Sequence, residues 1–408
     1  MTQETYTLID DEVSVKISGS APESLRTKRI KRTGVRVYQD GCLGVSGYMG
    51  EEGEAEALKR AQAALAYKVP YPCQPEVNFK RAEEEGGKPF TPEALDAEAG
   101  AVLAALKKDF PQFVFSAPGI KSGTATATLK NSACLDLSHA VTNHEFGLLY
   151  KLATSASIMD GWFAFEGPRY DRAAFLAYAY EVLNAHLKEV PPLPAEGKLP
   201  VFFEDSDPLV RSIFGRELSG MNYGSGGSLF AGKAGQKLFS EGLTLFNGRG
   251  KSRLPFFDAE GVTGEGFAYI ENGVLKAPFC DKKTAQKFGF TPSGSAYAAY
   301  DGAPETGPAC ATIKPQTKTV KEILGGQSAV FVAMASGGDF TSEGGFGTPA
   351  QLAFLLKDGK LVGKLPELQL SSSVYEMYGP GFLGVSADTI MPLSSNHWLG
   401  FMMYVRKA

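Results

Sequence analysis

Cysteine and histidine are scarce in this chain, and their scarcity excludes several kinds of site. Its 408 residues include five cysteines, at positions 42, 73, 134, 280 and 310, and no two of them form a CxxC pair. An odd number of widely spaced cysteines indicates reduced thiols, without a disulfide framework or a cysteine-built zinc site. The four histidines, at positions 139, 144, 186 and 397, are similarly dispersed.

A strong positive charge is also missing. The formal net charge is −4, and the calculated isoelectric point is about 5.8. A protein that holds a phosphate backbone needs clustered Lys and Arg on one face, so we expect no direct binding of nucleic acid. The one short basic cluster, Lys28 to Arg32, leads into an apparent strand, Val35 to Tyr38, and is predicted to be a solvated strand edge.

Long apolar runs are absent as well. No window of about 18 uninterrupted apolar residues occurs, which excludes an obvious membrane-spanning helix. The first residues, Met1 to Tyr6, have neither the basic region nor the apolar segment of a secretory signal. We therefore expect a soluble, cytoplasmic protein with no membrane partner.

The composition that remains is typical of a globular chain with two domains. Hydrophobic residues make up 43% and charged residues 21%, so the chain has enough apolar surface to form cores. The sharpest change in composition is the proline-rich stretch from Val190 to Pro200, which favours an extended connector. This predicts an N-terminal domain at 1–190 and a C-terminal domain at 198–408.

Local patterns predict an α+β fold. The Asp40-Gly41 pair favours a hairpin turn within Arg36 to Gly47, because it tolerates the positive φ that such turns need. Other N-terminal segments indicate a mixed sheet with covering helices: helices at Glu54–Leu65, Pro92–Phe110 and Arg172–Leu187, and a strand meander between Thr124 and Phe165. Beyond 198, short apolar runs with helical patches only at about 207–219 and 281–288 predict a mostly antiparallel β domain.

Several ordered blocks in the second half carry a family resemblance. They are Ser228-Leu229-Phe230-Ala231-Gly232-Lys233, Asp258-Ala259-Glu260-Gly261, Ile270-Glu271-Asn272-Gly273-Val274-Leu275-Lys276, Ser293-Gly294-Ser295, Ser336-Gly337-Gly338-Asp339-Phe340 and Gly344-Gly345-Phe346-Gly347. In this order the blocks resemble the TldD/PmbA family. The resemblance covers 200–390 well and the N-terminal half more loosely.

The same resemblance implies that a zinc site has been lost. Active members of the family carry an HExxxH helix and a cysteine near the C-terminus, and aligning the blocks places the two histidines on Arg211 and Arg216 and the glutamate on Ser212. Arginine stays protonated and has no lone pair for a metal. The last cysteine is Cys310, so no thiolate lies near the expected third ligand at about 384–392. The pattern is similar to the PmbA/TldE-like branch, which lacks the motif, and implies no cofactor.

Some readings of individual residues stay open at this point. Zinc would bind only at a relocated site, for which His139 and His144 are the candidates. Arg211 and Arg216 are either solvated helix residues or a clamp for a peptide carboxylate. The glycine pairs Gly337, Gly338, Gly344 and Gly345 mark tight turns, or allow close approach of a bound extended peptide.

The resemblance implies a function in peptide maturation by proteolysis. We expect a non-catalytic, PmbA/TldE-like subunit that forms a dimer with a TldD-like subunit or with itself and holds unfolded peptide by strand addition. The family's older description as a modulator of DNA gyrase implies only an indirect link to DNA. Two alternatives are an active metallopeptidase with a relocated metal site and a stand-alone peptide-binding homodimer.

Overall fold

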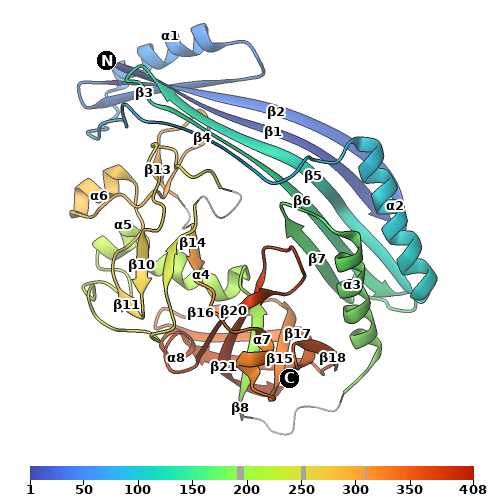
Figure 1. The fold of residues 1–408 in the computed structure, drawn as a ribbon. Helices are drawn as coiled ribbons and strands as arrows, with labels where there is room; N and C mark the ends of the chain where they lie inside the picture. The colour runs from blue at the N-terminus through green and yellow to red at the C-terminus, as the bar shows by residue number, and fades with distance from the viewer. Residues whose placement is uncertain (191–196, 250–253, 308–309) are drawn as a thin grey trace.

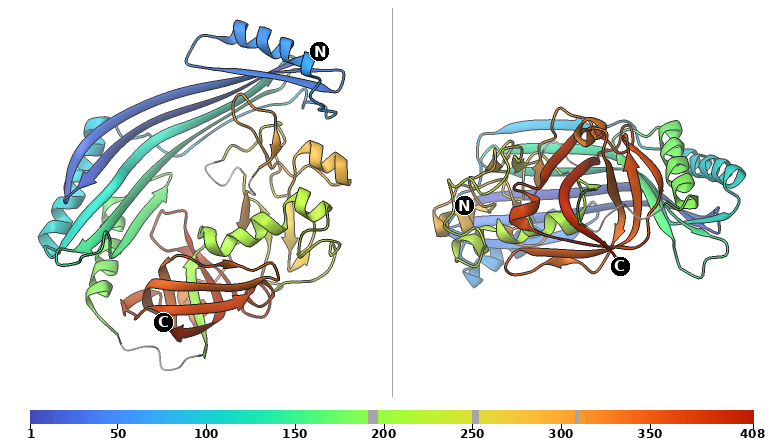
Figure 2. Two further views of the ribbon diagram at one scale, coloured as in Figure 1. Left: turned by 180° about the vertical axis from the view of Figure 1, so that it is seen from behind. Right: turned by 90° about the horizontal axis from the view of Figure 1, so that it is seen from below.

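A long, curved N-terminal sheet arches over a β-rich C-terminal half (Figures 1 and 2). The structure is a computed structural model that describes residues 1–190, 197–249, 254–307 and 310–408. The N-terminal sheet is mixed and carries helices, while strands dominate the C-terminal half. The predicted α+β class is therefore confirmed. Within the described residues, no helix is both long and apolar enough to cross a membrane.

Seven strands form the N-terminal sheet, in the order β3-β2-β1-β5-β6-β4, and β7 also pairs with β6. Their bounds are Thr2–Ser18 (β1), Ala21–Gln39 (β2), Cys42–Met49 (β3), Lys80–Glu85 (β4), Phe113–Asn131 (β5), Asp136–Leu152 (β6) and Gly161–Gly167 (β7). The sheet is mixed because β4 runs parallel to β6, whereas the other pairs are antiparallel. The predicted hairpin turns at Asp40 and Gly41, both with positive φ.

Three helices accompany this sheet: α1 (Glu54–Ala64, followed by a short 3-10 turn at Leu65–Tyr67), α2 (Pro92–Asp109) and α3 (Arg172–Leu187). All three lie close to their predicted positions. Helix α2 begins where Thr91 accepts a hydrogen bond from the Ala94 N–H and Pro92 occupies the first turn. Helices α1 and α2 cover the outer, convex side of the sheet (Figure 1), which leaves the concave side facing the C-terminal half.

Oppositely charged side chains of β1 and β2 form ion pairs on the concave face. Arg32 Nη1 lies 3.0 Å from Asp10 Oδ2, and Lys28 Nζ lies 3.5 Å from Glu12 Oε1. Strand β3 pairs only with Arg32 to Gln39, so the earlier part of β2 is an open edge. The basic cluster is thus a solvated strand edge, as predicted. Lys28, Arg29 and Arg32 are matched by acids on β1, and Lys31 is matched by Glu51.

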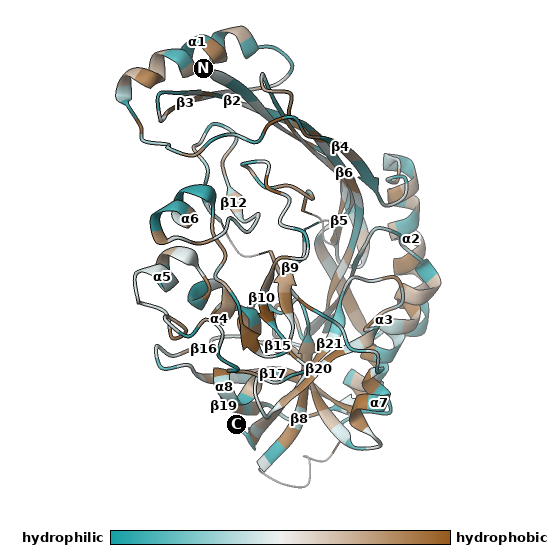
Figure 3. Ribbon diagram, turned by 60° about the vertical axis from the view of Figure 1, so that its left-hand side comes forward, coloured by the Kyte–Doolittle hydropathy of each residue, from teal (hydrophilic) through white to brown (hydrophobic). Residues whose placement is uncertain are grey.

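Five strands of the C-terminal half close into a ring. They are β8 (Gly197–Glu204), β15 (Ser328–Ala335), β17 (Gly345–Lys357), β19 (Leu368–Ser373) and β21 (His397–Lys407). Strand β15 pairs with both β8 and β17, and β21 joins β8 to β19, which pairs with β17. Figure 2 shows this barrel from below, and its strands are largely hydrophobic in Figure 3.

Smaller elements surround the barrel. They are α4 (Pro208–Glu217), α5 (Gly220–Gly224), β9 (Leu245–Asn247), β10 (Ala268–Glu271), β11 (Val274–Leu275), α6 (Lys282–Phe288), β12 (Ala296–Tyr297), β13 (Glu305–Thr306), β14 (Ala311–Ile313), α7 (Val320–Leu324), β16 (Asp339–Phe340), β18 (Lys360–Lys364), α8 (Val374–Met377) and β20 (Phe382–Thr389). Helices α4 and α6 match the two predicted patches. The short helices α5, α7 and α8 were not predicted, because four or five residues are too few to show helical periodicity.

Two large cores hold the molecule together. One fills the barrel and extends to α4, and the other joins α2, α3 and the N-terminal sheet to the outer wall of the barrel through Phe202, Phe331 and Trp398. The second core belongs to both halves of the chain. The division into domains at 1–190 and 198–408 therefore stays a prediction. Residues 191–196 of the predicted connector lie outside the described residues, and Gly197 to Pro200 already belong to β8.

Candidate functional site around helix α4

Helix α4 lies between the concave face of the sheet and the barrel (Figure 1). It begins where Asp207 accepts hydrogen bonds from the N–H groups of Leu209 and Val210, at 2.8 and 3.4 Å, with Pro208 in the first turn. Its apolar residues Val210, Ile213 and Phe214 pack into the barrel core. Helix α4 carries Arg211, Ser212 and Arg216, the three positions on which the resemblance places the metal motif.

Arg211 and Ser212 make local contacts. The Arg211 Nη1 donates to the backbone oxygen of Asp205 at 3.3 Å, and the Ser212 hydroxyl donates to the backbone oxygen of Leu209 at 2.9 Å. Ser212 is thus the type of helix residue that bonds back to the preceding turn. Neither residue offers a metal the imidazole or carboxylate that the active motif would supply.

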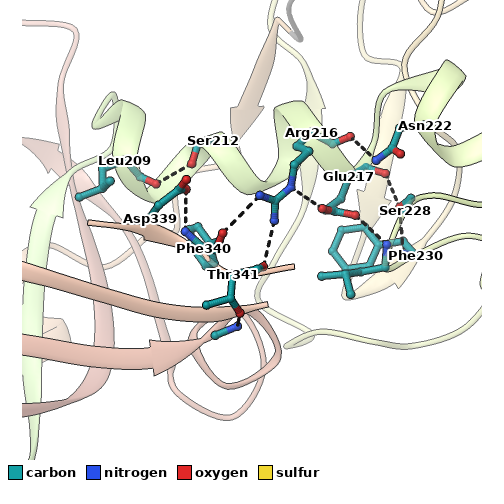
Figure 4. A network of polar contacts seen from close by, with 12 residues as sticks. Leu209, Ser212, Arg216, Glu217, Asn222, Ser228, Phe230, Asp339, Phe340 and Thr341 are labelled. Carbon is teal, nitrogen blue, oxygen red and sulfur yellow. Dashed lines mark hydrogen bonds and ion pairs between the residues drawn. The ribbon is translucent and has the colours of Figure 1, made fainter. Parts of the chain in front are cut away.

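Arg216 anchors a glycine-rich loop (Figure 4). Its Nη1 and Nη2 donate to the backbone oxygens of Phe340 and Thr341 at 3.3 and 3.2 Å, and its Nε lies 2.6 Å from Glu217 Oε1. Glu217 is 3% exposed and also accepts the Leu229 N–H at 2.6 Å. Because its guanidinium is already engaged on three sides, Arg216 is poorly placed to clamp a peptide carboxylate. A clamp at Arg211 stays a prediction.

The four predicted glycines lie on either side of β16. Gly337 and Gly344 have φ of 78° and 84°, a region that L side chains rarely adopt. A Cβ on Gly338 would meet the Thr348 side chain at 2.3 Å. Gly337 also lines a groove of about 730 Å³ with Pro349 and Tyr404 on the barrel wall. The turn geometry explains Gly337 and Gly344, and peptide binding at the four glycines stays a prediction.

The candidates for a relocated metal site are separated by the sheet. His139 and His144 are an odd number of residues apart on β6, so they point to opposite faces. His144 points to the convex side of the sheet, which the helices cover, and its Nδ1 is 3.0 Å from the Ser122 hydroxyl. This pair therefore does not form one metal site.

Another group of potential ligands surrounds His139. Glu83, Glu85 and His139 are, within the described ranges, the one set of three His, Cys, Asp or Glu residues whose ligand atoms lie within 4.8 Å of one another. However, the Nδ1 of His139 accepts the Phe256 N–H at 3.0 Å, so in the neutral ring the proton sits on Nε2. That Nε2–H faces Glu85 at 3.5 Å. A protonated nitrogen cannot ligate, so this arrangement fits a histidine–carboxylate contact better than a metal centre.

The Asp258-Ala259-Glu260 block attaches the C-terminal half to the N-terminal sheet. Asp258 accepts the N–H groups of Glu260 and Ala296, each at 2.8 Å. The carbonyl of Ala259 accepts Arg36 Nη1 at 2.5 Å, and Glu260 accepts the hydroxyl of Tyr71. Burial and the nearby Asp258 charge raise the pKa of Glu260 to about 7. The block that carries the resemblance thus has a structural role, which the sequence analysis did not assign.

Three carboxylates at the start of α4 also escaped the sequence analysis. Burial raises the pKa of Glu204 to about 7, with further contributions from Asp207 and Asp205, and burial raises the pKa values of both aspartates. The sequence signal was available: Glu204-Asp205-Ser206-Asp207 places three acids directly before a helix-starting proline. The sequence does not indicate that these acids lie near the concave face, because only the fold brings the two segments together.

Comparison with known proteins identifies a family and several relatives that this chain resembles. Residues 196–397 match the family described as PmbA/TldA metallopeptidase C-terminal domain. A metalloprotease of Methanothermobacter thermautotrophicus is 29% identical over 184 residues, which cover 40% of each chain. One of Archaeoglobus fulgidus is 26% identical over 234 residues, which cover 53% of this chain and 55% of that protein. The matches thus span about half, or less, of these relatives.

Two solved structures share the fold along the whole chain. The structure of TldE from Thermococcus kodakarensis superposes with a TM-score of 0.79 at 18% identity, covering 100% of this chain and 97% of that one. A proposed modulator of a DNA gyrase from Thermotoga maritima gives a TM-score of 0.74 at 18% identity, covering 99% and 95%. At this level of identity the superpositions establish the fold.

Proposed function

Because the chain belongs to the PmbA/TldD family through its C-terminal domain, we propose that it is a non-catalytic, PmbA/TldE-like subunit of a metallopeptidase assembly. In this assembly a TldD-like partner carries the zinc and cleaves the peptide, and the present chain holds unfolded peptide beside it. The assembly acts in the cytoplasm on peptides and has no direct contact with nucleic acid.

One observation carries this proposal: the chemistry of helix α4. The segment on which the sequence analysis placed the motif is a helix, and its Arg211, Ser212 and Arg216 bond to backbone oxygens and to Glu217. Zinc needs imidazole, thiolate or carboxylate donors to acidify its bound water. A helix whose cations face backbone carbonyls supports a scaffolding role for this subunit.

Peptide holding by strand addition is supported by the open edges of the N-terminal sheet. The first part of β2, Ala21 to Lys31, has no strand on its outer side among the described residues. An extended peptide can pair with such an edge through its backbone. The five main strands of the barrel pair in a closed ring, so they offer fewer free backbone groups to which a peptide strand could pair.

The decisive experiment is coexpression with a TldD-like protein. We expect the two chains to copurify, and we expect the complex, but not the present chain alone, to cleave an unfolded peptide. The matched control replaces the glutamate of the partner's HExxxH motif with glutamine, which should abolish cleavage without dissociating the complex. Failure to copurify would favour the stand-alone homodimer.

The alternative of an active peptidase is tested on the isolated chain. Elemental analysis after purification without chelator should find no stoichiometric zinc. Peptide hydrolysis by the isolated chain, lost in a His139→Gln variant, would overturn the proposal in favour of a relocated site. A gel shift that weakened steeply with salt would overturn the expectation about nucleic acid.

A further inference from the structure

A cavity of about 330 Å³ lies between the concave face of the N-terminal sheet and the start of α4. Strands β5, β6 and β7 supply one wall, and β8 with the turn before β21 supplies the other. The lining residues that matter here are Glu145, Gly147, Leu149, Trp162, Ala164, Glu166, Glu204 and Asn396. The cavity therefore opens beside the same helix that carries the aligned metal motif.

Small residues leave the inner wall of this cavity open. A Cβ added to Gly147 would meet only the Ala164 side chain, at an ordinary distance of 3.6 Å. Leu149 and Trp162 flank this opening, and Trp162 is fixed because its Nε1 donates to the Ala333 carbonyl at 2.9 Å. The indole is 40% exposed. The walls thus suit an unbranched apolar chain.

Acidic groups also line the cavity. Glu204 accepts a hydrogen bond from Asn396 Nδ2 at 3.1 Å, and in the part of the chain that the structure describes the groups that act on its charge are Asn396, Asp205 and Asp207, with no cation among them. Glu145 lies 3.6 Å from Lys121 Nζ, and Glu166 adds a third carboxylate to the lining. A carboxylate in such surroundings is stabilised by an incoming cation, which compensates for its lost hydration.

We infer that this cavity is a subsite for a lysine or arginine side chain of a bound peptide. The methylene stem lies against Leu149, Gly147 and the Trp162 ring, and the ammonium or guanidinium group reaches Glu204. Long basic side chains bury their stems while keeping the charge among polar groups, and an indole ring attracts cations. The inference rests on the proposed function in naming a peptide as the source of that side chain, whereas the cavity can be tested alone.

The cavity is first tested with n-butylammonium, which has the stem and charge of lysine but no peptide backbone. Acrylamide quenching of tryptophan fluorescence reports Trp162, because Trp398, the other tryptophan, is 3% exposed. We expect n-butylammonium to protect Trp162 from quenching. The affinity for n-butanol should be about tenfold lower, because n-butanol lacks the charge that strengthens the hydrogen bond to Glu204.

Two variants locate the effect. Glu204→Gln keeps the shape of the side chain but removes its charge, and should reduce the affinity for n-butylammonium about tenfold. Gly147→Val fills the opening and should abolish the protection. Glu305→Gln, at an exposed position elsewhere, is the matched control and should change nothing. Equal protection by both probes, or an unaffected Glu204→Gln variant, would overturn the inference.

Peptides then separate this inference from the proposed function. Matched unfolded peptides that differ at one position, lysine against norleucine, should differ about tenfold in affinity in the wild type and should bind equally to Glu204→Gln. Peptides that bind regardless of this charge would support peptide holding and refute the subsite. Selective n-butylammonium binding without peptide binding would keep the cation site and refute peptide holding.

Discussion

At the scale of single residues, α4 shows how similar side chains acquire different roles. Arg216 connects two carbonyls and a buried carboxylate, whereas Arg211 makes a single bond to a carbonyl. The guanidinium group provides the fork of donors that the first role needs. The acids before the helix differ as well, because Asp207 caps the helix and Glu204 faces the cavity.

Replacing Arg216 with lysine should therefore destabilise the protein although the charge is kept. One ammonium cannot reach both carbonyls and Glu217, so we expect a loss of about 1–2 kcal/mol in the free energy of unfolding. Chemical denaturation measures this value. Arg211→Lys serves as the matched control and should cost less than about 1 kcal/mol. Equal effects of the two substitutions would contradict the anchoring role.

Glu204 should make stability depend on pH. Its pKa of about 7 in the folded chain exceeds the ordinary value of 4.5, so the folded state binds the proton more tightly, and stability is lost as the pH rises through 7. Glu204→Gln should thus be more stable than the wild type at pH 8.5, by about 1–2 kcal/mol, and nearly equal to it at pH 4, below the ordinary pKa. Thermal unfolding at both pH values tests this, and a pH-independent difference would refute it.

At the scale of elements, glycines have opposite effects depending on their surroundings. Gly100 lies inside α2, where an added Cβ would meet no atom within 4 Å. Gly34 lies on β2 directly below the Tyr300 carbonyl, which an added Cβ would approach to 1.7 Å. The first glycine only weakens its helix, while the second lets the loop before β13 rest on the sheet.

Alanine substitutions should separate these two cases. Gly100→Ala should stabilise the protein by about 0.5–1 kcal/mol, because alanine restricts the unfolded chain and favours helix. Gly34→Ala should destabilise it by about 2–3 kcal/mol, through forced movement of a backbone carbonyl. Urea denaturation gives both values, and a neutral Gly34→Ala would mean that the Tyr300 loop is displaced easily.

Local and long-range features differ in how well the sequence predicts them. The turn at Asp40-Gly41 and helix α2 were predictable, since dihedral preference and capping act over a few residues. The ring of strands was not, because nothing near Val201 indicates that its strand lies between β15 and β21. The cavity could not be predicted either, because Gly147 and Glu204 come from different halves of the chain and meet only in the folded structure. The positions of the metal motif came from resemblance, and their contacts from the structure.

At the scale of the whole molecule, a shared core joins the two halves. Phe331 and Trp398 from the barrel lie in one cluster with Phe163 and Phe175 from the N-terminal half, and the Phe331 and Trp398 rings are 4.9 Å apart. A core that spans both halves couples their unfolding. Separate folding of the 1–190 segment would leave this apolar surface exposed to water.

Phe331→Ala should accordingly destabilise both halves together, by about 3–5 kcal/mol. Circular dichroism, which follows mainly the longer helices of the N-terminal half, and Trp398 emission in a Trp162→Phe background, which follows the barrel, should shift to the same new midpoint. Phe288→Ala, on α6 and outside the shared core, is the control and should have a smaller effect. Two separate transitions would indicate independent domains.

The closed ring of strands has a consequence for how the protein is made. Strand β8 leaves the ribosome long before β15 and β21, the two strands that pair with it, and its run Val201-Phe202-Phe203 is fully buried in the finished structure. Contacts between distant segments form slowly, and exposed apolar strands associate with other chains in the meantime. During synthesis, this nascent chain should depend on chaperones that shield β8 until its neighbours arrive.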